Sequence, residues 1–453
     1  MEPGEFERVA ASFAAFHREF APLFGRREAQ AHSEQYVRGL LVQQTDRRNA
    51  ENLAEAVDGV SARALQRFVT DAPWETGPVL ERLQRFVGQR LSSPHGVWVV
   101  DESGFPKAGQ KSVGVRHQYC GRVGKVTNCQ MGVFLAYVSE RGRALVDGRL
   151  YLPEVWTEDP ARCRAAGVPA GVEFATKAEL ALAQLRQART WGHLHSPWVT
   201  ADAGYGEVPS FRDALDADGF LYVLEVPLAT PVFTTAAEVA VPAWTGRGRK
   251  PTLPRLVAGS PLPQTAQAVA APLEPQDWQE LTVAEGAQGP RTYQFAGLRV
   301  WESREGLPGR PCWLVLRRNL DGAELKAYLA NVPADTELQT LAQVSAWRWP
   351  IETEFQTTKS ETGLDEYEVR SWRGWHHHIT LSLLAGAFLL QMQQDWGGKD
   401  APDHASSSQP RAARPLASAP LDRGGPARLA AVHSRAQRAG QTIPHQAPSA
   451  QAA

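Results

Sequence analysis

Apolar residues recur at helical spacing through the first 95 residues of the chain. These repeats cover Phe6 to Phe24, Tyr36 to Leu41, Leu53 to Val57 and Ala64 to Val69, and a further helix is predicted from Pro78 to Leu91. Short helices joined by tight turns are typical of DNA-binding domains, and also of bundles that cap a neighbouring domain. Residues 1–95 are therefore predicted to form a helical N-terminal domain that binds DNA, with a capping bundle as the alternative.

The pattern changes to short apolar runs between residues 96 and 227. Strands are predicted over Val97–Val100, Ser112–Tyr119, Gln130–Val138 and, as a further extended segment, Ala144–Leu152. A helix should begin at the capping box formed by Thr176 and Glu179. The strand Trp198–Ala201, a short helix from Pro209 and the strand Phe220–Val226 follow. Antiparallel strands followed by alternating helices and strands predict a mixed α/β sheet with flanking helices.

Three segments follow this sheet. Residues 228–335 are rich in proline, glycine, threonine and valine, include the basic loop Gly246-Arg247-Gly248-Arg249-Lys250, and are predicted to form a β-rich insertion. Helical periodicity returns over 336–396, where Pro350 suits the first turn of a helix. Residues 397–453 have no aromatic side chain and many Ala, Pro, Ser, Gln and Arg residues, which predicts a disordered, mildly basic tail.

Composition narrows the class of protein only slightly. The 453 residues, 43% hydrophobic and 21% charged, suit a globular protein of two or three domains. The formal net charge of -1 does not point to nucleic acid, although a basic groove could lie within a neutral total. Four widely spaced cysteines without a C-x-x-C pair argue against a zinc site and favour a reduced compartment. With no signal-peptide pattern and no apolar run long enough for a bilayer, a cytoplasmic, nucleoid-associated protein without a membrane partner is expected.

Three acidic residues stand at the boundaries of predicted elements. Asp101 follows the apolar run Val97–Val100, Asp202 follows Trp198–Ala201, and Glu352 comes just after Pro350. Carboxylates at strand ends face a cleft while the strands stay buried, so they can converge on metal ions. Phosphoryl transfer by two metals needs ions about 3.5–4 Å apart that clamp the attacking and leaving oxygens. Magnesium keeps several waters, so two or three carboxylates suffice.

The segments around these acids resemble DDE transposases of bacterial insertion sequences, most closely the group named after insertion sequence seven-hundred-one. The resemblance rests on segments that occur in the order of the family, from about residue 6 to 392: Val99 to Lys107, Gly124 to Gln130, Tyr151 to Trp156, Val199 to Gly206, Arg348 to Glu352 and Gly363 to Arg370. It implies an RNase H-like catalytic core in which Asp101, Asp202 and Glu352 are the catalytic and metal-binding residues.

The resemblance also implies further features of a transposase. Related transposases carry a tyrosine-arginine-glutamate-lysine signature, which Arg348, Glu352 and Lys359 match, whereas Ser345 stands at the tyrosine position. The expected cofactor is a pair of Mg²⁺ ions, which Mn²⁺ could replace. The expected partners are double-stranded DNA, as terminal inverted repeats and target, and a second copy of the chain on paired ends.

Helix geometry separates Glu352 from its neighbour Glu354. The two residues point about 200° apart on a helix, and Lys359 lies two turns from Glu352 on the same face. Lys359 could therefore hold the phosphate beside the scissile bond. Glu102 alternates to the opposite face of the strand from Asp101 and is expected to be structural.

Four cations are predicted to contact DNA: Arg348, Lys359, Lys107 and Lys125. The last two lie in loops near Asp101, where contacts with the DNA backbone would make binding salt-dependent. A solvated charged loop is the alternative for each. The function predicted is cut-and-paste transposition, with an RNase H-fold DNA endonuclease or an inactive DNA-binding relic of a transposase as alternatives. Paired carboxylates and abundant tryptophan also occur in glycoside hydrolases, but the spacing does not favour that class.

Overall fold

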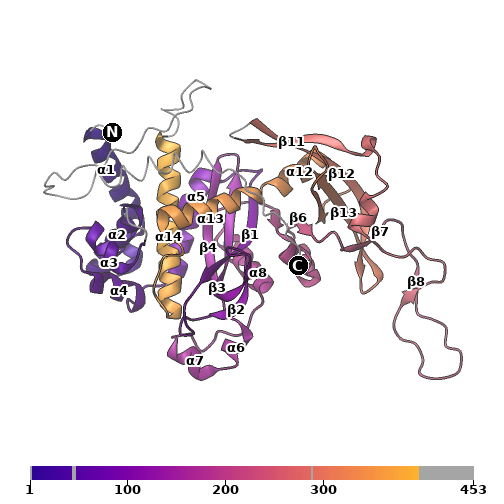
Figure 1. The fold of residues 1–453 in the computed structure, drawn as a ribbon, viewed down its shortest axis with the longest axis horizontal. Helices are drawn as coiled ribbons and strands as arrows, with labels where there is room; N and C mark the ends of the chain where they lie inside the picture. The colour runs from indigo at the N-terminus through magenta and orange to yellow at the C-terminus, as the bar shows by residue number, and fades with distance from the viewer. Residues whose placement is uncertain (1–2, 43–46, 287–288, 397–453) are drawn as a thin grey trace, which may run out of the picture.

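A computed structural model describes residues 3–42, 47–286 and 289–396 of the chain (Figure 1). The segment 397–453, predicted to be a disordered tail, lies outside the described residues. The rest is a mixed α/β protein built on one large sheet with flanking helices, as predicted. The sheet has 12 strands, ten of them in the order β10-β7-β12-β13-β14-β6-β5-β1-β3-β2, with β4 beside β3 and β11 beside β12.

One half of this sheet comes from the segment predicted to be mixed α/β. Its strands are β1 (Val97–Pro106), β2 (Arg116–Cys120), β3 (Lys125–Ser139), β4 (Gly142–Tyr151), β5 (Trp198–Ala201) and β6 (Leu221–Val226). Strands β1 to β4 pair antiparallel, whereas β5 pairs parallel with both β1 and β6. The parallel strands need helical crossovers, and α8 (Lys177–Trp191) begins at the predicted capping box of Thr176 and Glu179.

Short helices complete the connections in this half. They are α6 (Glu154–Thr157), α7 (Pro160–Ala165), α9 (Ala203–Gly206) and α10 (Pro209–Ala217). Proline stands in the first turn of α7 and α10, where its missing N–H is not needed.

The β-rich segment continues the same sheet. Its strands are β7 (Pro231–Phe233), β8 (Val239–Ala240), β9 (Arg255–Leu256), β10 (Gln264–Thr265), β11 (Gln279–Gly286), β12 (Gly289–Arg304), β13 (Leu307–Arg318) and β14 (Leu325–Ala330), with α11 (Ala266–Ala270) and η2 (Pro275–Asp277) between them. Strand β14 pairs antiparallel with β6, so backbone hydrogen bonds cross directly from the insertion into the core. A second, smaller hydrophobic cluster packs within the insertion.

The N-terminal helices share the main hydrophobic core with the sheet. They are α1 (Pro3–Phe20), η1 (Ala21–Phe24), α2 (Arg27–Val42), α3 (Ala50–Ala56), α4 (Ala62–Thr70) and α5 (Thr76–Leu91). The C-terminal helices are α12 (Leu338–Ala346), α13 (Trp349–Thr362) and α14 (Trp372–Trp396). Helix α14 lies between helices α1 to α4 and the sheet, in contact with α2, α4 and β4, and also with α5, which packs on the sheet itself (Figure 1).

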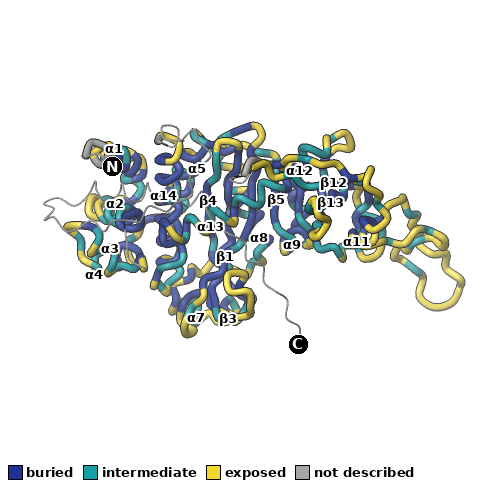
Figure 2. Tube along the Cα trace, turned by 45° about the horizontal axis from the view of Figure 1, so that its top comes forward, coloured by how far each residue is buried: buried dark blue, intermediate teal, exposed yellow. Residues whose placement is uncertain are grey.

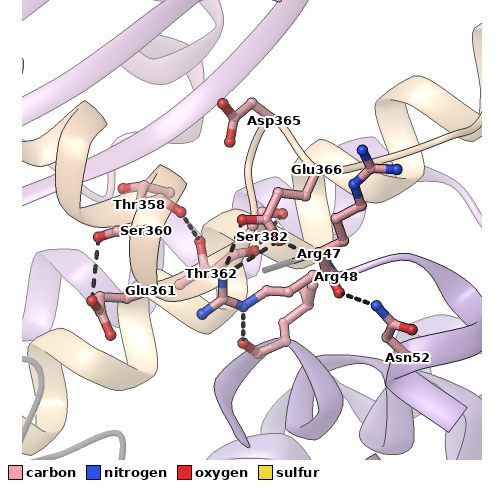
Figure 3. A network of polar contacts seen from close by, with 12 residues as sticks. Arg47, Arg48, Asn52, Thr358, Ser360, Glu361, Thr362, Asp365, Glu366 and Ser382 are labelled. Atoms are coloured by element: carbon pink, nitrogen blue, oxygen red, sulfur yellow. Dashed lines mark hydrogen bonds and ion pairs between the residues drawn. The ribbon is translucent and has the colours of Figure 1, made fainter. Parts of the chain in front are cut away.

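A polar network also joins the N-terminal helices to the segment after α13 (Figure 3). The backbone N–H and the guanidinium of Arg48 donate to the Glu366 carboxylate, at 2.6 and 3.3 Å, and the Arg48 Nε donates to the Leu40 carbonyl. Gly363 ends α13 with a φ of +62°, where an added Cβ would lie 2.6 Å from Arg48 Cδ. A glycine is therefore required there both for the turn and for the close approach.

The prediction that Asp101 ends its strand is wrong. Strand β1 continues to Pro106, because its pairing with β3 runs from Val97 to Pro106. Only the parallel pairing with β5 stops at Val100, opposite Ala201. Beyond Val100, β1 has no partner strand on the side of β5. Asp101 borders a cavity because of this gap in the sheet, not because β1 ends there.

No helix in the described parts of the chain is long and apolar enough to cross a membrane.

Candidate active site

The three predicted carboxylates line one cavity of about 880 Å³. Asp101 comes from the middle of β1, Asp202 follows β5, and Glu352 lies in the first turn of α13. Two neighbouring strands and one helix, far apart in sequence, therefore bring these acids to a single opening beside the sheet.

Asp101 is the most buried of the three, with 12% of its side chain exposed. Its Oδ1 accepts a hydrogen bond from the Glu102 N–H at 2.7 Å. Burial, and after it the nearby charge of Asp202, raise the pKa of Asp101 to about 7 against the opposing effect of the Arg348 guanidinium. Such a carboxylate is stabilised by any cation that enters the cavity.

Asp202 is fixed by the helix that follows it. It is the N-cap of α9, and its Oδ1 accepts hydrogen bonds from the N–H groups of Gly204 at 3.0 Å and Tyr205 at 3.4 Å. Aspartate is a preferred N-cap because its side chain satisfies N–H groups that have no partner within the helix. The cap holds this carboxylate at the cavity wall.

Arg348 lies among three carboxylates of the cavity. Its Nη1 is 3.8 Å from Asp101 Oδ2, its Nη2 is 3.5 Å from Glu352 Oε1, and its Nε is 3.6 Å from Glu225 Oε2. Arg348 is the N-cap residue of α13, which places its guanidinium one turn from Glu352. These carboxylates hold the pKa of Arg348 above its usual value, against the opposing effect of burial.

Glu225 is a fourth acid that the sequence does not single out. It lies on β6 next to Leu224, which pairs with Ala201, so it stands beside Asp202 at the same edge of the sheet. Lys326 on β14 donates to both of its carboxylate oxygens, at 3.1 and 3.3 Å. The one available signal was a charged residue inside the apolar strand Leu221–Val226, which is weak without knowledge of the neighbouring strands.

The cavity is acidic overall. Seven of its lining residues are carboxylic acids and three are cations, namely Arg122, Arg348 and Lys359. A phosphate backbone would be repelled from such a site unless further cations entered it. Hard oxygen donors of this kind suit Mg²⁺.

The donors fit a divalent ion by their chemistry, but they are not gathered around one point. Over the described ranges, no group of three His, Cys, Asp or Glu residues is arranged so that it could hold a metal ion. The Arg348 guanidinium contacts Asp101 and Glu352 instead, as a cation already among the carboxylates. Metal binding at these residues therefore requires Arg348 or the Glu352 side chain, which is 49% exposed, to move.

Lys359 lines the cavity two turns after Glu352 on α13. Burial and the charge of Arg122 lower the pKa of Lys359 to about 8. Arg122 itself pairs with Asp365 at the rim. Among the three cations that line the cavity, Lys359 lies on the same helix as Glu352. It forms no ion pair with any described residue, whereas Arg122 and Arg348 do.

The other two predicted DNA contacts do not line the cavity. The Lys107 ammonium donates to the Tyr367 carbonyl at 3.0 Å and lies 3.5 Å from the centre of the Tyr367 ring. Burial lowers the pKa of Lys107 to about 8. Lys125 is exposed at the start of β3.

Three further residues bear on the predicted site. Glu354 is outside the cavity and pairs with Arg143 of β4 at 3.2 Å. Ser345, at the tyrosine position of the signature, is buried in α12 and donates to the Ala342 carbonyl. Glu102 lines the cavity, against the prediction that it faces the other way, because both alternate positions of β1 reach the open edge beyond Val100. Its carboxylate is paired with Lys177 at 2.6 Å.

Residues 19–290 match the family described as DDE superfamily endonuclease. The chain belongs to that family. The match includes Asp101 and Asp202 and ends before Glu352, whose role as the third acid stays a prediction.

One relative has the name "Probable transposase for insertion sequence element IS701", from Microchaete diplosiphon. It is 24% identical over 181 residues, which are 40% of this chain and 44% of that protein, so the chain spans less than half of this relative's length. Together with the family match, this likeness agrees with the predicted resemblance to DDE transposases of that group. A solved cryo-EM structure of the piggyBac transposase synaptic complex with hairpin DNA matches with 8% identity and a TM-score of 0.38, over 96% of this chain and 77% of that one.

Proposed function

We propose that this protein is a DNA transposase that cleaves DNA strands at the cavity of Asp101, Asp202 and Glu352 and joins the freed 3′-OH to target DNA. The observation that carries the proposal is the convergence of these three acids, from β1, the start of α9 and α13, on one cavity. The antiparallel strands β1, β3 and β4, extended in parallel by β5 and β6, support an RNase H-like core.

The three acids would hold two Mg²⁺ ions, or Mn²⁺ in their place. When bound, such ions supply charge for the attacking and leaving oxygens of an in-line displacement. Asp101, Asp202 and Glu352 would each supply carboxylate oxygens to these ions. Lys359 lies on the same face of α13 as Glu352 and would hold the phosphate beside the scissile bond. Arg348 would either bind that phosphate or keep the carboxylates neutralised before the metal arrives.

The remaining parts of the function follow from the chemistry of moving DNA. Both ends of an element must be cut in one complex, so a homodimer on paired terminal repeats is proposed. The N-terminal helices, which contact α14 and the segment after α13, would bind these ends. Lys107 and Lys125 remain predicted backbone contacts at the edge of this surface. The proposed place of action is DNA of the bacterial nucleoid.

A strand-transfer assay tests the proposal. The full chain is mixed with a labelled duplex that carries the sequence flanking its gene, a target plasmid and MgCl₂. Asp101→Asn, Asp202→Asn and Glu352→Gln should each abolish cleavage and joining, because each removes a charged oxygen donor. Glu354→Gln, which alters a buried acid outside the cavity, is the matched control and should keep activity.

Each result discriminates between functions. Undiminished activity in one of the three variants would withdraw that residue from the site. Cleavage without a joined product would favour the alternative of a DNA endonuclease with the same fold. Binding without cleavage at any metal concentration would favour an inactive relic.

A further inference from the structure

Residues 234–263 form an arm that leaves the large sheet between β7 and β10. The arm contains the only two strands of the described residues that lie outside the 12-stranded sheet, β8 and β9, which pair antiparallel. Figure 1 shows it projecting at the end of the molecule opposite the N-terminal helices. Figure 2 shows its outer part almost wholly exposed.

The arm has an internal structure despite its exposure. The Val257 N–H donates to the Glu238 carbonyl at 2.9 Å beside the β8–β9 pair. At the tip, the indole N–H of Trp244 donates to the Gly248 carbonyl at 3.2 Å. Gly246 and Gly248 have φ angles of +82° and +73°, which side chains with a Cβ rarely adopt. The tip is therefore a shaped turn with Arg247 at its centre.

The charge of the tip contrasts with that of the whole chain. Beyond Glu238 the arm has no acid, but it carries four cations, Arg247, Arg249, Lys250 and Arg255. Arg247, Arg249 and Lys250 are exposed, and none of them forms an ion pair with a described residue. Although the whole chain has a formal charge of -1, the tip of the arm is locally basic. Such a cluster of exposed cations suits binding to a polyanion.

We infer that the arm binds duplex DNA, with Arg247 and Arg249 in the minor groove. The inference rests on the proposed function for the choice of DNA as the polyanion. The minor groove is only about 6 Å wide, and the tip has no helix that would fill the major groove. Glycines on both sides of Arg247 leave space for the groove walls, and arginine is attracted to the narrow groove of A/T-rich DNA. The arm would thus hold DNA outside the cavity.

Fluorescence anisotropy with the full chain tests the arm directly. Labelled A/T-rich and G/C-rich duplexes of equal length are titrated in EDTA, so that no cleavage occurs, at several salt concentrations. The double variant Arg247→Ala, Arg249→Ala should weaken binding to the A/T-rich duplex about tenfold and reduce the salt slope by about 2, since each positive charge removed from between the phosphate strands lowers it by roughly 0.9.

Two control variants sharpen the result. Arg247→Lys with Arg249→Lys keeps the charge and should keep the salt slope, but it should reduce the preference for A/T-rich DNA. Arg164→Ala removes an exposed cation of α7, outside the arm, and should change neither quantity. The arm side chains are exposed, so all variants should unfold at the wild-type urea concentration.

Three outcomes would overturn the inference. If the wild type binds DNA and the double alanine variant binds equally well, the arm is not a DNA contact, while the proposed transposase function stands. If the wild type binds no duplex at all, both the arm and the proposed function fail. If the arm variants lose binding only to vesicles containing phosphatidylserine, the tip is a membrane contact instead.

Discussion

Replacing Arg348 with methionine removes the guanidinium that contacts Asp101, Glu225 and Glu352 but keeps an unbranched apolar side chain. Without a metal, three carboxylates then face one another across the cavity. Arg348, Asp101 and Glu225 have 14%, 12% and 16% of their side chains exposed, so this is a nearly buried cluster. The contact with Glu352, which is 49% exposed, is screened by solvent and adds little.

The size of the effect follows from these contacts. A charge pair 4 Å apart has a gross attraction of about 4 kcal/mol at an effective dielectric constant of 20, and desolvation offsets part of it. Removing one partner of a buried pair typically costs about 3–5 kcal/mol. We therefore expect Arg348→Met to lower the free energy of unfolding by about 3 kcal/mol in EDTA. Magnesium should restore much of this loss, because the metal no longer competes with a resident cation.

Urea unfolding of the wild type and of Arg348→Met, each in EDTA and in MgCl₂, measures both the loss of stability and its recovery on magnesium binding. Magnesium should stabilise Arg348→Met more than it stabilises the wild type, and the variant should bind the ion about tenfold more tightly, equivalent to about 1.4 kcal/mol. Arg143→Met breaks a pair with Glu354 on the other side of α13 and serves as the control, destabilising equally in both buffers. Equal magnesium effects in the wild type and Arg348→Met would refute the reasoning.

Three further predictions concern stability. Arg212→Met should lower the free energy of unfolding by about 3 kcal/mol in urea titrations, because it removes the buried partner at 3.2 Å from the Glu302 carboxylate and leaves Arg304 as its remaining cation; a loss below 1 kcal/mol would contradict this. Glu354→Gln should unfold at lower urea yet cleave DNA at the wild-type rate, and loss of cleavage in the folded variant would place Glu354 in the site. Burial lowers the pKa of His378 to about 3, so between that value and 6.5 the unfolded chain binds more protons than the folded one. Stability should thus fall by about 2 kcal/mol for this residue from about pH 7.5 to pH 5, and His378→Gln should show a shallower dependence.

Local patterns predicted the positions of two of the three candidate acids, Asp202 and Glu352, whereas their assignment with Asp101 as one metal-binding set came from the family resemblance. Asp202 follows a short apolar strand, as the run Trp198–Ala201 predicts, whereas its role as the N-cap of α9 was not predicted. Helix periodicity put Glu352 and Glu354 on different faces, as the structure has them, and the spacing to Lys359 favoured Glu352. The capping box of Thr176 and Glu179 could likewise be predicted from the sequence, because its hydrogen bonds join residues only three positions apart.

Which cations neutralise the acids of the cavity could not be predicted, because they are brought there by contacts between segments far apart in the sequence. Strand β14 pairs with β6 across about a hundred residues of chain, and this pairing brings Lys326 to Glu225. Arg348, at the start of α13, approaches Glu225 from a third element. Asp101 is exposed to the cavity because β5 stops pairing at Val100, not because its own strand ends. The sequence by itself determined the kinds of elements and the acids they carry, since propensity, capping and periodicity act over a few residues. Only the tertiary structure decided which charges neutralise one another, because that depends on which strands lie side by side.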